Sequence, residues 1–284
     1  MLTIATLIAS ERLDESLADA AAARFGAMRG AWIEHGSALD LHFAGDMPPG
    51  EGWEGVDLLP ITPGPRLRSL LVADMDSTMI GQECIDELAD YAGVKSQVAE
   101  ITERAMQGEL DFAGALRARV ALLEGLDEAV LARCLAERVR PNPGAKTLIA
   151  TMRQHGATCL LVSGGFTAFA GPVGAMLGFD EVRANTLTIR NGRLSGTVDG
   201  TIVDSTTKRA SLEEARARLG LASDATMALG DGANDRAMVE AAGWGVAYHA
   251  KPALAALADA RLDHHGLDAL LWAQGIPSTE WVLD

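Results

Sequence analysis

Short apolar runs recur four times along this 284-residue chain, most of them followed at once by Gly, Ser or Asp. Helical segments separate the runs, an alternation typical of a parallel sheet with helices on both faces. Ligands of such sheets bind beyond the carboxyl ends of the strands, so we expect any chemistry just after each run. The predicted fold class is therefore α/β, with a doubly wound, Rossmann-like sheet built on residues 70–73, 158–162, 226–229 and 245–248.

The chain before this sheet predicts a separate small α/β module. Residues 2–9 favour a strand, 13–25 favour a helix, and 31–43 can supply two short strands. Residues 45–65 are rich in proline and glycine, a composition typical of a linker. We therefore expect a first domain over residues 1–66, with the linker included.

A long helical insertion is predicted between the first two strands of the sheet. Residues 81–139 are helical in character almost throughout, and this is too long for an ordinary crossover. We expect them to form a cap over the sheet edge, which leaves 67–80 and 140–284 as the core. Residues 186–203 predict a β-hairpin around Asn191-Gly192, a strong turn signal.

The charge and the cysteines restrict the class of protein. The 24 basic and 39 acidic residues give a formal charge of −15, which disfavours a nucleic-acid partner. A phosphorylated substrate would also be repelled, so its site needs local positive charge. The three cysteines match no zinc spacing, which favours a reduced, cytoplasmic setting. No apolar stretch reaches the roughly 18 residues of a membrane span, and residues 1–10 favour a strand over a signal peptide.

Candidate catalytic residues follow the first two runs. Asp74 and Asp76 come directly after the first. One carboxylate could hold a hard cation while it attacks phosphorus, and the other could handle protons. Ser163 and Gly164 follow the second run and could cradle an oxyanion. A polar turn and a glycine turn would look the same, so neither signal decides alone.

Two further signals surround the third run. Lys208 precedes it and could supply a point charge to phosphate, although a lysine is usually solvated. Residues 230–235 follow it, with three polar side chains in a turn that contains glycines: Asp231, Asn234 and Asp235. Their position at a strand end favours a site over a surface turn.

Arg119 lies on an apolar helical face of the predicted cap. Seven residues, almost two turns, separate it from Phe112. An arginine on such a face is expected either to make a structural ion pair or to bind an anion. Glu83, near the start of the cap, is open to the same two interpretations.

Taken together, these elements resemble the haloacid dehalogenase superfamily. Its phosphatases carry Asp-x-Asp-x-Thr, then Ser or Thr after the second strand, then Lys, then Gly-Asp-x-x-x-Asp. Residues 74–78, Ser163, Lys208 and 230–235 match this pattern, and order and spacing fit over residues 67–250.

Within the superfamily, the cap is similar to that of the phosphoserine phosphatase family. That family's Met, Phe and Arg series is matched by Met106, Gly108, Asp111-Phe112, Leu116 and Arg119-Val120. Glu83 stands where the family has an acidic residue near the substrate amine. The first 65 residues look like a small ligand-binding module, ACT-like in type, to which no site residue is assigned. The resemblance implies hydrolysis of O-phosphoserine, the last step of serine biosynthesis, with a homodimer as one possible assembly.

The resemblance also implies roles for the catalytic residues. Asp74 would be the nucleophile that forms an aspartyl-phosphate. Asp76 would protonate the leaving seryl oxygen and then act as base for the hydrolytic water. Mg²⁺ would bind Asp74, Asp231 and the main-chain carbonyl of Asp76, with Asp235 supporting the metal site.

Substrate contacts are implied in the same way. Ser163, Gly164, Lys208 and Asn234 would hold the phosphate. Arg119 would pair with the substrate carboxylate and Glu83 with its ammonium group. Met106 and Phe112 would close the apolar wall of the site.

Three rival functions remain to be weighed. A dehalogenase has no need of an acid at Asp76, which speaks against it. A phosphotransferase or a phosphatase acting on another small ester, such as phosphohomoserine, would use the same residues and stays open. An amino-acid-binding regulator with an inactive phosphatase fold is disfavoured by the intact Asp74, Asp76, Lys208 and Asp231.

Overall fold

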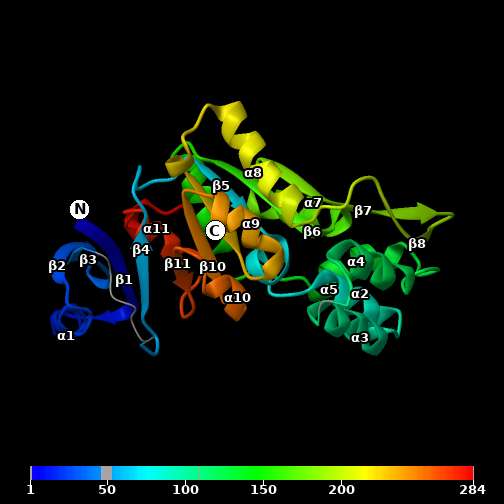
Figure 1. Cartoon of the computed structure of the whole chain (residues 1–284), viewed down its shortest axis with the longest axis horizontal. Coiled ribbons are helices and arrows are strands. Elements are labelled where there is room, and N and C mark those ends of the chain that lie inside the picture. The colour runs from blue at the N-terminus through cyan, green and yellow to red at the C-terminus, as the bar shows by residue number, and fades with distance from the viewer. Residues whose placement is uncertain (1, 46–52, 108, 284) are drawn as a thin grey trace.

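The N-terminal module is an antiparallel sheet with one helix. A computed structural model describes residues 2–45, 53–107 and 109–283 (Figure 1). Within those residues the module's sheet has four strands in the order β2-β3-β1-β4. Asp14 caps the helix by accepting a hydrogen bond from the Leu17 N–H at 2.8 Å. The elements are β1 (Leu2–Leu13), α1 (Glu15–Phe25), β2 (Met28–Glu34), β3 (Gly36–Ala44) and β4 (Asp57–Ile61).

Part of the segment predicted to be a linker is a strand, so that prediction was wrong for residues 57–61. β4 pairs with β1 in antiparallel register, with Ile61 opposite Ile4, and Leu59 is buried. Pro60 is tolerated because β4 lies at the edge of the module's sheet, where a missing N–H breaks no ladder. The surrounding Pro and Gly concealed this short apolar stretch. Residues 46–52 lie outside the described part of the chain.

The core contains the parallel sheet that the sequence predicts, and the α/β fold class is confirmed. Within the described residues the sheet has seven strands in the order β11-β10-β9-β5-β6-β7-β8. All neighbours pair in parallel except β7 and β8, which form the predicted hairpin. The strands are β5 (Leu70–Ala73), β6 (Thr158–Phe166), β7 (Glu181–Arg190), β8 (Arg193–Asp199), β9 (Thr226–Gly230), β10 (Trp244–Tyr248) and β11 (Ala260–Leu262).

Helices cover both faces of this sheet and bury its central strand. Every residue of β5 is buried, and its side chains belong to two apolar clusters on opposite faces. Alternate residues of a strand point to opposite faces, so β5 anchors the whole sheet. The packed helices are α6 (Ala145–Gln154), α7 (Thr167–Leu177), α8 (Ser205–Leu219), α9 (Arg236–Ala241), α10 (Pro252–Ala255) and α11 (Ala269–Ala273).

The insertion forms a helical lobe at the end of the molecule opposite the module (Figure 1). Its helices are α2 (Cys84–Tyr91), α3 (Lys95–Met106), α4 (Phe112–Ala121) and α5 (Ala129–Arg138). The two chain segments that connect this lobe to the core run side by side. The Gly81 N–H donates to Arg140 O at 3.2 Å, and the Asn142 N–H donates to Met79 O at 2.9 Å. The hairpin makes a second attachment, with the Gly125 N–H donating to Leu194 O at 2.8 Å.

Carboxylates with several hydrogen bonds join the module to the core. Arg66 donates to both oxygens of Asp40, at 2.6 and 2.7 Å. Glu34 accepts from the Trp272 indole N–H at 2.6 Å and from the Ser278 N–H at 2.8 Å. Charge-assisted hydrogen bonds of this kind are stronger than neutral ones, so the module is firmly held.

Asp57 is the most fully bonded of these carboxylates. Its oxygens accept from the N–H groups of Asp263 at 2.9 Å and of His264 and His265 at 3.1 Å each. His265 Nδ1 lies 2.7 Å from the same carboxylate, while the Ser10 N–H donates to His265 Nε2 at 3.1 Å. This partner set requires the proton on Nδ1. Burial opposes ionisation of Asp57, but hydrogen bonds from His265 and the backbone outweigh it and lower its pKa.

Asp57→Asn is expected to destabilise the protein by about 2–3 kcal/mol at pH 7, because backbone donors lose a charged acceptor. The pKa of Asp57 is depressed in the folded state, so its contribution is present above its ordinary pKa and is lost as pH falls through the folded value. The difference in unfolding free energy between the two proteins should therefore shrink below about pH 4. Denaturant titrations from pH 3 to 7 measure it. A difference that does not change with pH would contradict this account.

Candidate active site

The loop that carries Asp74 and Asp76 follows β5 at the carboxyl edge of the sheet. The Asp74 side chain is buried and its Oδ1 accepts from the Met75 N–H at 2.7 Å. Ser77 has a left-handed backbone with φ of 56°, which costs a residue with a Cβ about 1–2 kcal/mol. Its hydroxyl donates to Glu83 Oε1 at 2.8 Å. The loop therefore directs the Asp74 carboxylate into the core. On the cap side, its strained residue Ser77 holds the carboxylate of Glu83.

Lys208 forms a buried ion triad with two of the predicted residues. Its Nζ lies 2.7 Å from Asp74 Oδ1 and 2.7 Å from Asp235 Oδ1, and its side chain has no exposure. Burial by itself lowers the pKa of Lys208, but the charges of Asp235 and Asp74 outweigh it and raise the pKa above its ordinary value. The ammonium group therefore stays charged, and it offsets the repulsion between two carboxylates.

Asp231 and Asp235 follow β9 and complete an acidic cluster with Asp74. Asp235 Oδ2 accepts from the N–H groups of Asp231 at 3.2 Å and Gly232 at 3.1 Å. An added Cβ at Gly230 would lie 2.4 Å from Asp235 Cγ, so only glycine fits there. Burial and the charge of Asp235 raise the pKa of Asp231 to about 6, and the same two causes raise that of Asp74 well above its ordinary range.

This cluster fits a hard divalent cation. Asp74, Asp231 and Asp235 each offer an oxygen within 4.8 Å of the others. Asp235 is occupied by Lys208 and two backbone N–H groups, and Asp74 by Lys208, Met75 and Asn234. Asp231, whose described side-chain partner is Lys251 at 3.6 Å, is the freest of the three donors. Carboxylate oxygens are the ligands that Mg²⁺ and Ca²⁺ prefer. Burial and the charge of Asp235 raise the pKa values of Asp74 and Asp231, and a cation bound between them would oppose both effects.

Asp76 occupies a different environment from Asp74. Burial and the nearby charge of Glu83 raise its pKa to about 7. Its buried Oδ1 has no hydrogen-bond partner among the described residues. An added Cβ at Gly165 would come within 2.9 Å of Asp76 Oδ2, so that glycine makes room for the carboxyl group. Asp76 Oδ2 therefore faces the end of β6, while Oδ1 is the oxygen without a described partner.

The predicted oxyanion cradle lies beside Asp76, at the end of β6. Ser163 is buried and its Oγ accepts from the Gly165 N–H at 2.8 Å. Across the edge of the sheet, Asn234 Nδ2 donates to Asp74 Oδ2 at 3.2 Å. The structure thus brings the ends of β5, β6 and β9 together around Asp74.

The cap contributes Phe112, Arg119 and Glu83 to the same region. An added Cβ at Gly164 would lie 2.9 Å from Phe112 Cζ, so this ring reaches the cradle. Burial lowers the pKa of Arg119, while the charges of Asp86, Glu83 and Asp76 oppose the change. Its guanidinium group therefore faces the acidic side of the site. Met106 ends α3, but its side chain lies outside the described part of the structure.

Sequence reasoning missed two residues at this edge. Asn185 is buried and bridges two segments: its Nδ2 donates to Gly164 O and its Oδ1 accepts from the Val203 N–H, both at 2.8 Å. No local pattern marks it. Lys251 Nζ lies 3.6 Å from Asp231 Oδ2. It stands three positions after the fourth apolar run. The expectation that functional residues follow such runs could therefore have identified it.

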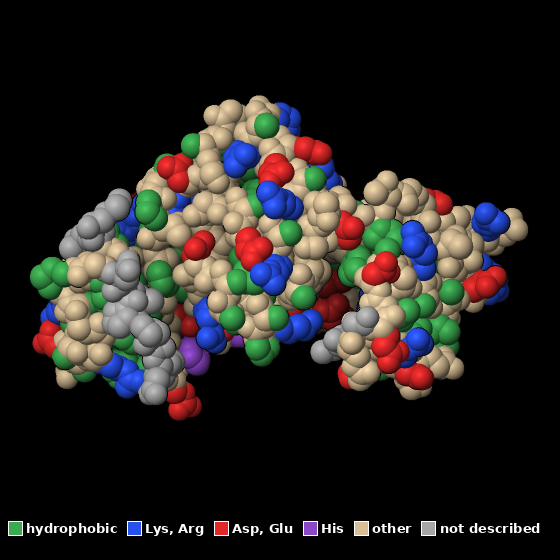
Figure 2. All heavy atoms as spheres, viewed as in Figure 1, with side chains coloured by type: hydrophobic (Ala, Val, Ile, Leu, Met, Phe, Trp, Pro, Cys, Tyr) green, Lys and Arg blue, Asp and Glu red, His purple; other side chains and the backbone are tan. Residues whose placement is uncertain are grey.

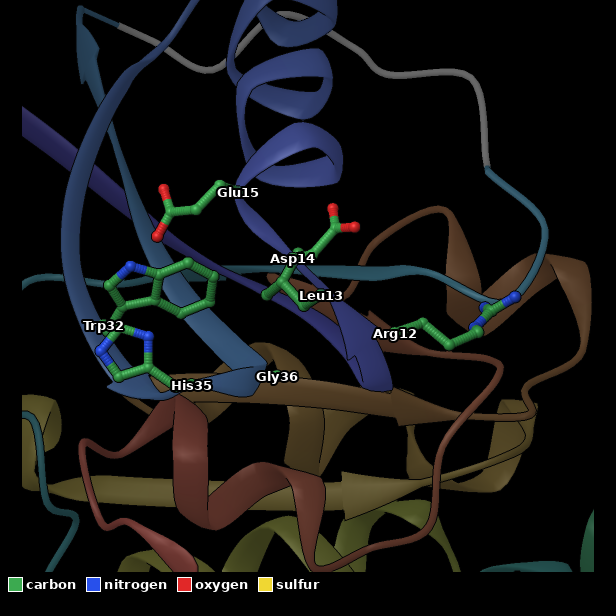
Figure 3. A pocket seen from close by; sticks show the side chains of 7 residues that line it. All are labelled: Arg12, Leu13, Asp14, Glu15, Trp32, His35 and Gly36. Carbon is green, nitrogen blue, oxygen red and sulfur yellow. The ribbon is translucent and has the colours of Figure 1, made fainter.

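The shape of the molecule agrees with a site between core and cap. Figure 2 shows a notch between these two lobes, with acidic side chains on its floor. A separate hollow of about 490 Å³ lies on the N-terminal module (Figure 3). There Arg29 pairs with Glu15 and lies over the Trp32 ring. This carboxylate and this ring therefore already have a cationic partner within the chain. No predicted catalytic residue lines it.

Cys84, Cys134 and Cys159 are free and buried. Among the residues described, every helix is too short or too polar to cross a bilayer.

Two proteins that are similar to this chain in sequence are named phosphoserine phosphatases. A phosphoserine phosphatase of Albidiferax ferrireducens is 48% identical over 207 residues, covering 71% of this chain and 87% of that protein. One from Streptomyces coelicolor is 45% identical over 80% of this chain, which spans only 55% of that longer relative.

Solved structures and a family model agree. A haloacid-dehalogenase-family hydrolase from Salmonella enterica serovar Typhi has a TM-score of 0.83, is 28% identical and covers 96% of this chain and 98% of its own. A phospho-aspartyl intermediate analogue of phosphoserine phosphatase has a TM-score of 0.68, is 36% identical and covers 72% and 98%. The family model for haloacid dehalogenase-like hydrolases matches residues 71–240. This chain belongs to the haloacid dehalogenase-like hydrolases.

Proposed function

We propose that this chain is a phosphoserine phosphatase, which hydrolyses O-phosphoserine to serine and phosphate in the last step of serine biosynthesis. The observation that carries the proposal is that two neighbouring carboxyl groups have different environments. Asp74 is bonded to Lys208, whereas Asp76 has an unpartnered oxygen and a pKa of about 7. A nucleophile and a proton carrier therefore stand two residues apart.

Asp74 attacks phosphorus and becomes an aspartyl-phosphate. Lys208 stabilises its anionic form, and hydrogen bonds from Met75 and Asn234 fix its orientation. One solved relative, 36% identical, represents a phospho-aspartyl analogue, which supports the same intermediate here. Lys208, Ser163 and the backbone at Gly164 then hold the phosphate oxygens and stabilise the charge of the transition state.

Asp76 moves the proton. In the first half-reaction it protonates the seryl oxygen that leaves. In the second it removes a proton from the water that attacks the aspartyl-phosphate. A carboxyl group with a pKa near 7 can do both at neutral pH, and its unused oxygen leaves it free for a substrate or a water.

We propose Mg²⁺ as the cofactor, held by the carboxylates of Asp74 and Asp231 and by the main-chain carbonyl of Asp76. When bound, it offsets the repulsion between the attacking carboxylate and the phosphate. Asp235 orients this site by holding Lys208 and the N–H groups of Asp231 and Gly232.

The cap reads the amino-acid part of the substrate. Arg119 pairs with its carboxylate and Glu83 with its ammonium group, while Phe112 and Met106 form an apolar wall. Phe112 already lies against Gly164, so cap closure places these groups over the phosphate site and excludes water. The relatives reported above are named for phosphatase activity, which favours hydrolysis over transfer to a second alcohol. The free, buried thiols favour the cytoplasm.

Asp74→Asn should abolish phosphate release from phosphoserine while the protein still folds, because the amide cannot attack phosphorus. Phosphate release and thermal unfolding test this in parallel. Asp235→Asn is the comparison, since it weakens the ion triad but leaves the nucleophile. Substantial turnover by Asp74→Asn would rule out the covalent mechanism.

Arg119→Ala should reduce kcat/KM for phosphoserine about 10- to 100-fold, the range expected when a charged hydrogen-bond partner is lost. p-Nitrophenyl phosphate lacks the carboxylate and should lose far less. Arg117→Ala is a matched control, because Arg117 is an exposed arginine on the same helix. Equal losses on both substrates would mean that Arg119 does not read the carboxylate.

A further inference from the structure

Lys251 stands beside the proposed metal site and has no role in the mechanism above. It follows β10, the parallel neighbour of β9, so it lies at the same edge of the sheet as Asp231. Its N–H donates to Asp231 O at 2.8 Å, and its Nζ lies 3.6 Å from Asp231 Oδ2. The backbone bond keeps the lysine beside the aspartate whatever its side chain does.

Two lysines that differ in burial contact the acidic cluster. Lys208 is fully buried and bridges Asp74 and Asp235. The Lys251 side chain is 63% exposed, while the Asp231 side chain that it meets is only 9% exposed. Among the described ion pairs Lys251 is the cation that meets Asp231. An exposed ammonium on a flexible stem can leave such a contact easily.

A divalent cation and Lys251 would compete for the same carboxylate. Like charges repel, so a cation bound at Asp231 displaces an ammonium that stood 3.6 Å from Oδ2. A displaced ammonium then stands at the mouth of a site that must attract a phosphate dianion in a chain of formal charge −15.

We propose that Lys251 is an exchangeable counter-ion: it neutralises Asp231 in the metal-free protein and attracts the substrate phosphate once the metal has taken its place. This inference rests on the proposed function. It predicts that one substitution changes two affinities in opposite directions. Removing the ammonium tightens the metal and weakens the phosphate ester, whereas a general structural defect would weaken both.

Calorimetric titration of the full chain with Mg²⁺ alone, at low ionic strength, tests the first half. Lys251→Met should bind Mg²⁺ about two- to five-fold more tightly than the original chain, the range for an exposed ion pair. Lys251→Arg keeps the charge and should bind as the original chain does. Lys95→Met removes an exposed lysine on the cap and should change nothing.

Steady-state kinetics at saturating Mg²⁺ test the second half. In Lys251→Met the KM for phosphoserine should rise about two- to five-fold with kcat unchanged, and the difference should fade as salt screens the charge. Unaltered Mg²⁺ affinity in Lys251→Met, or a loss of both affinities, would overturn the inference. If the original chain bound no Mg²⁺, the proposed metal cofactor would be wrong. The inference that Lys251 competes with the metal would then be wrong as well.

Discussion

The ammonium group of Lys208, shared between Asp74 and Asp235, is the interaction on which the rest of the site depends. Three carboxylates lie close enough to hold one ion, and without a buried cation their mutual repulsion would favour protonation or local rearrangement. The contact also joins α8 to the ends of β5 and β9. Breaking such a pair from one side typically costs about 3–5 kcal/mol, so the triad is both an electrostatic and a structural tie.

Around this triad, the catalytic edge collects features that are unfavourable by themselves. Ser77 has a left-handed backbone, Asp76 has a buried oxygen without a described partner, and Asp231 has a raised pKa. Such features persist only where the surrounding structure is rigid. The rigidity comes from β5, which is buried on both faces, and from glycines that fit where no side chain could. The features that cost stability at this edge are thus the same ones that leave polar groups available for chemistry.

The N-terminal module and the cap are attached to the core in different ways. The module meets the core through carboxylates that each accept several hydrogen bonds, as Asp57 does. The cap is connected by two chain segments with neutral backbone hydrogen bonds and by contacts with the hairpin. Its apolar residues, Leu116 and Val120 among them, also belong to the same buried cluster as the sheet. Most of the buried apolar residues of the module form a cluster of their own.

The sequence by itself determined the parallel sheet, the helical insertion and the identity of most residues at the catalytic edge, because burial periodicity and strand-end chemistry are local patterns. It misjudged residues 57–61, where a short strand is stabilised by an edge of β1 that composition does not reveal. Only the tertiary structure decided which charges meet. Lys208 contacts Asp74, although 134 positions of sequence separate them. Asn185 donates a hydrogen bond to Gly164 O, a contact that no sequence pattern predicts. Such pairings depend on the path of the chain through space, whereas burial depends mainly on each segment's own side chains.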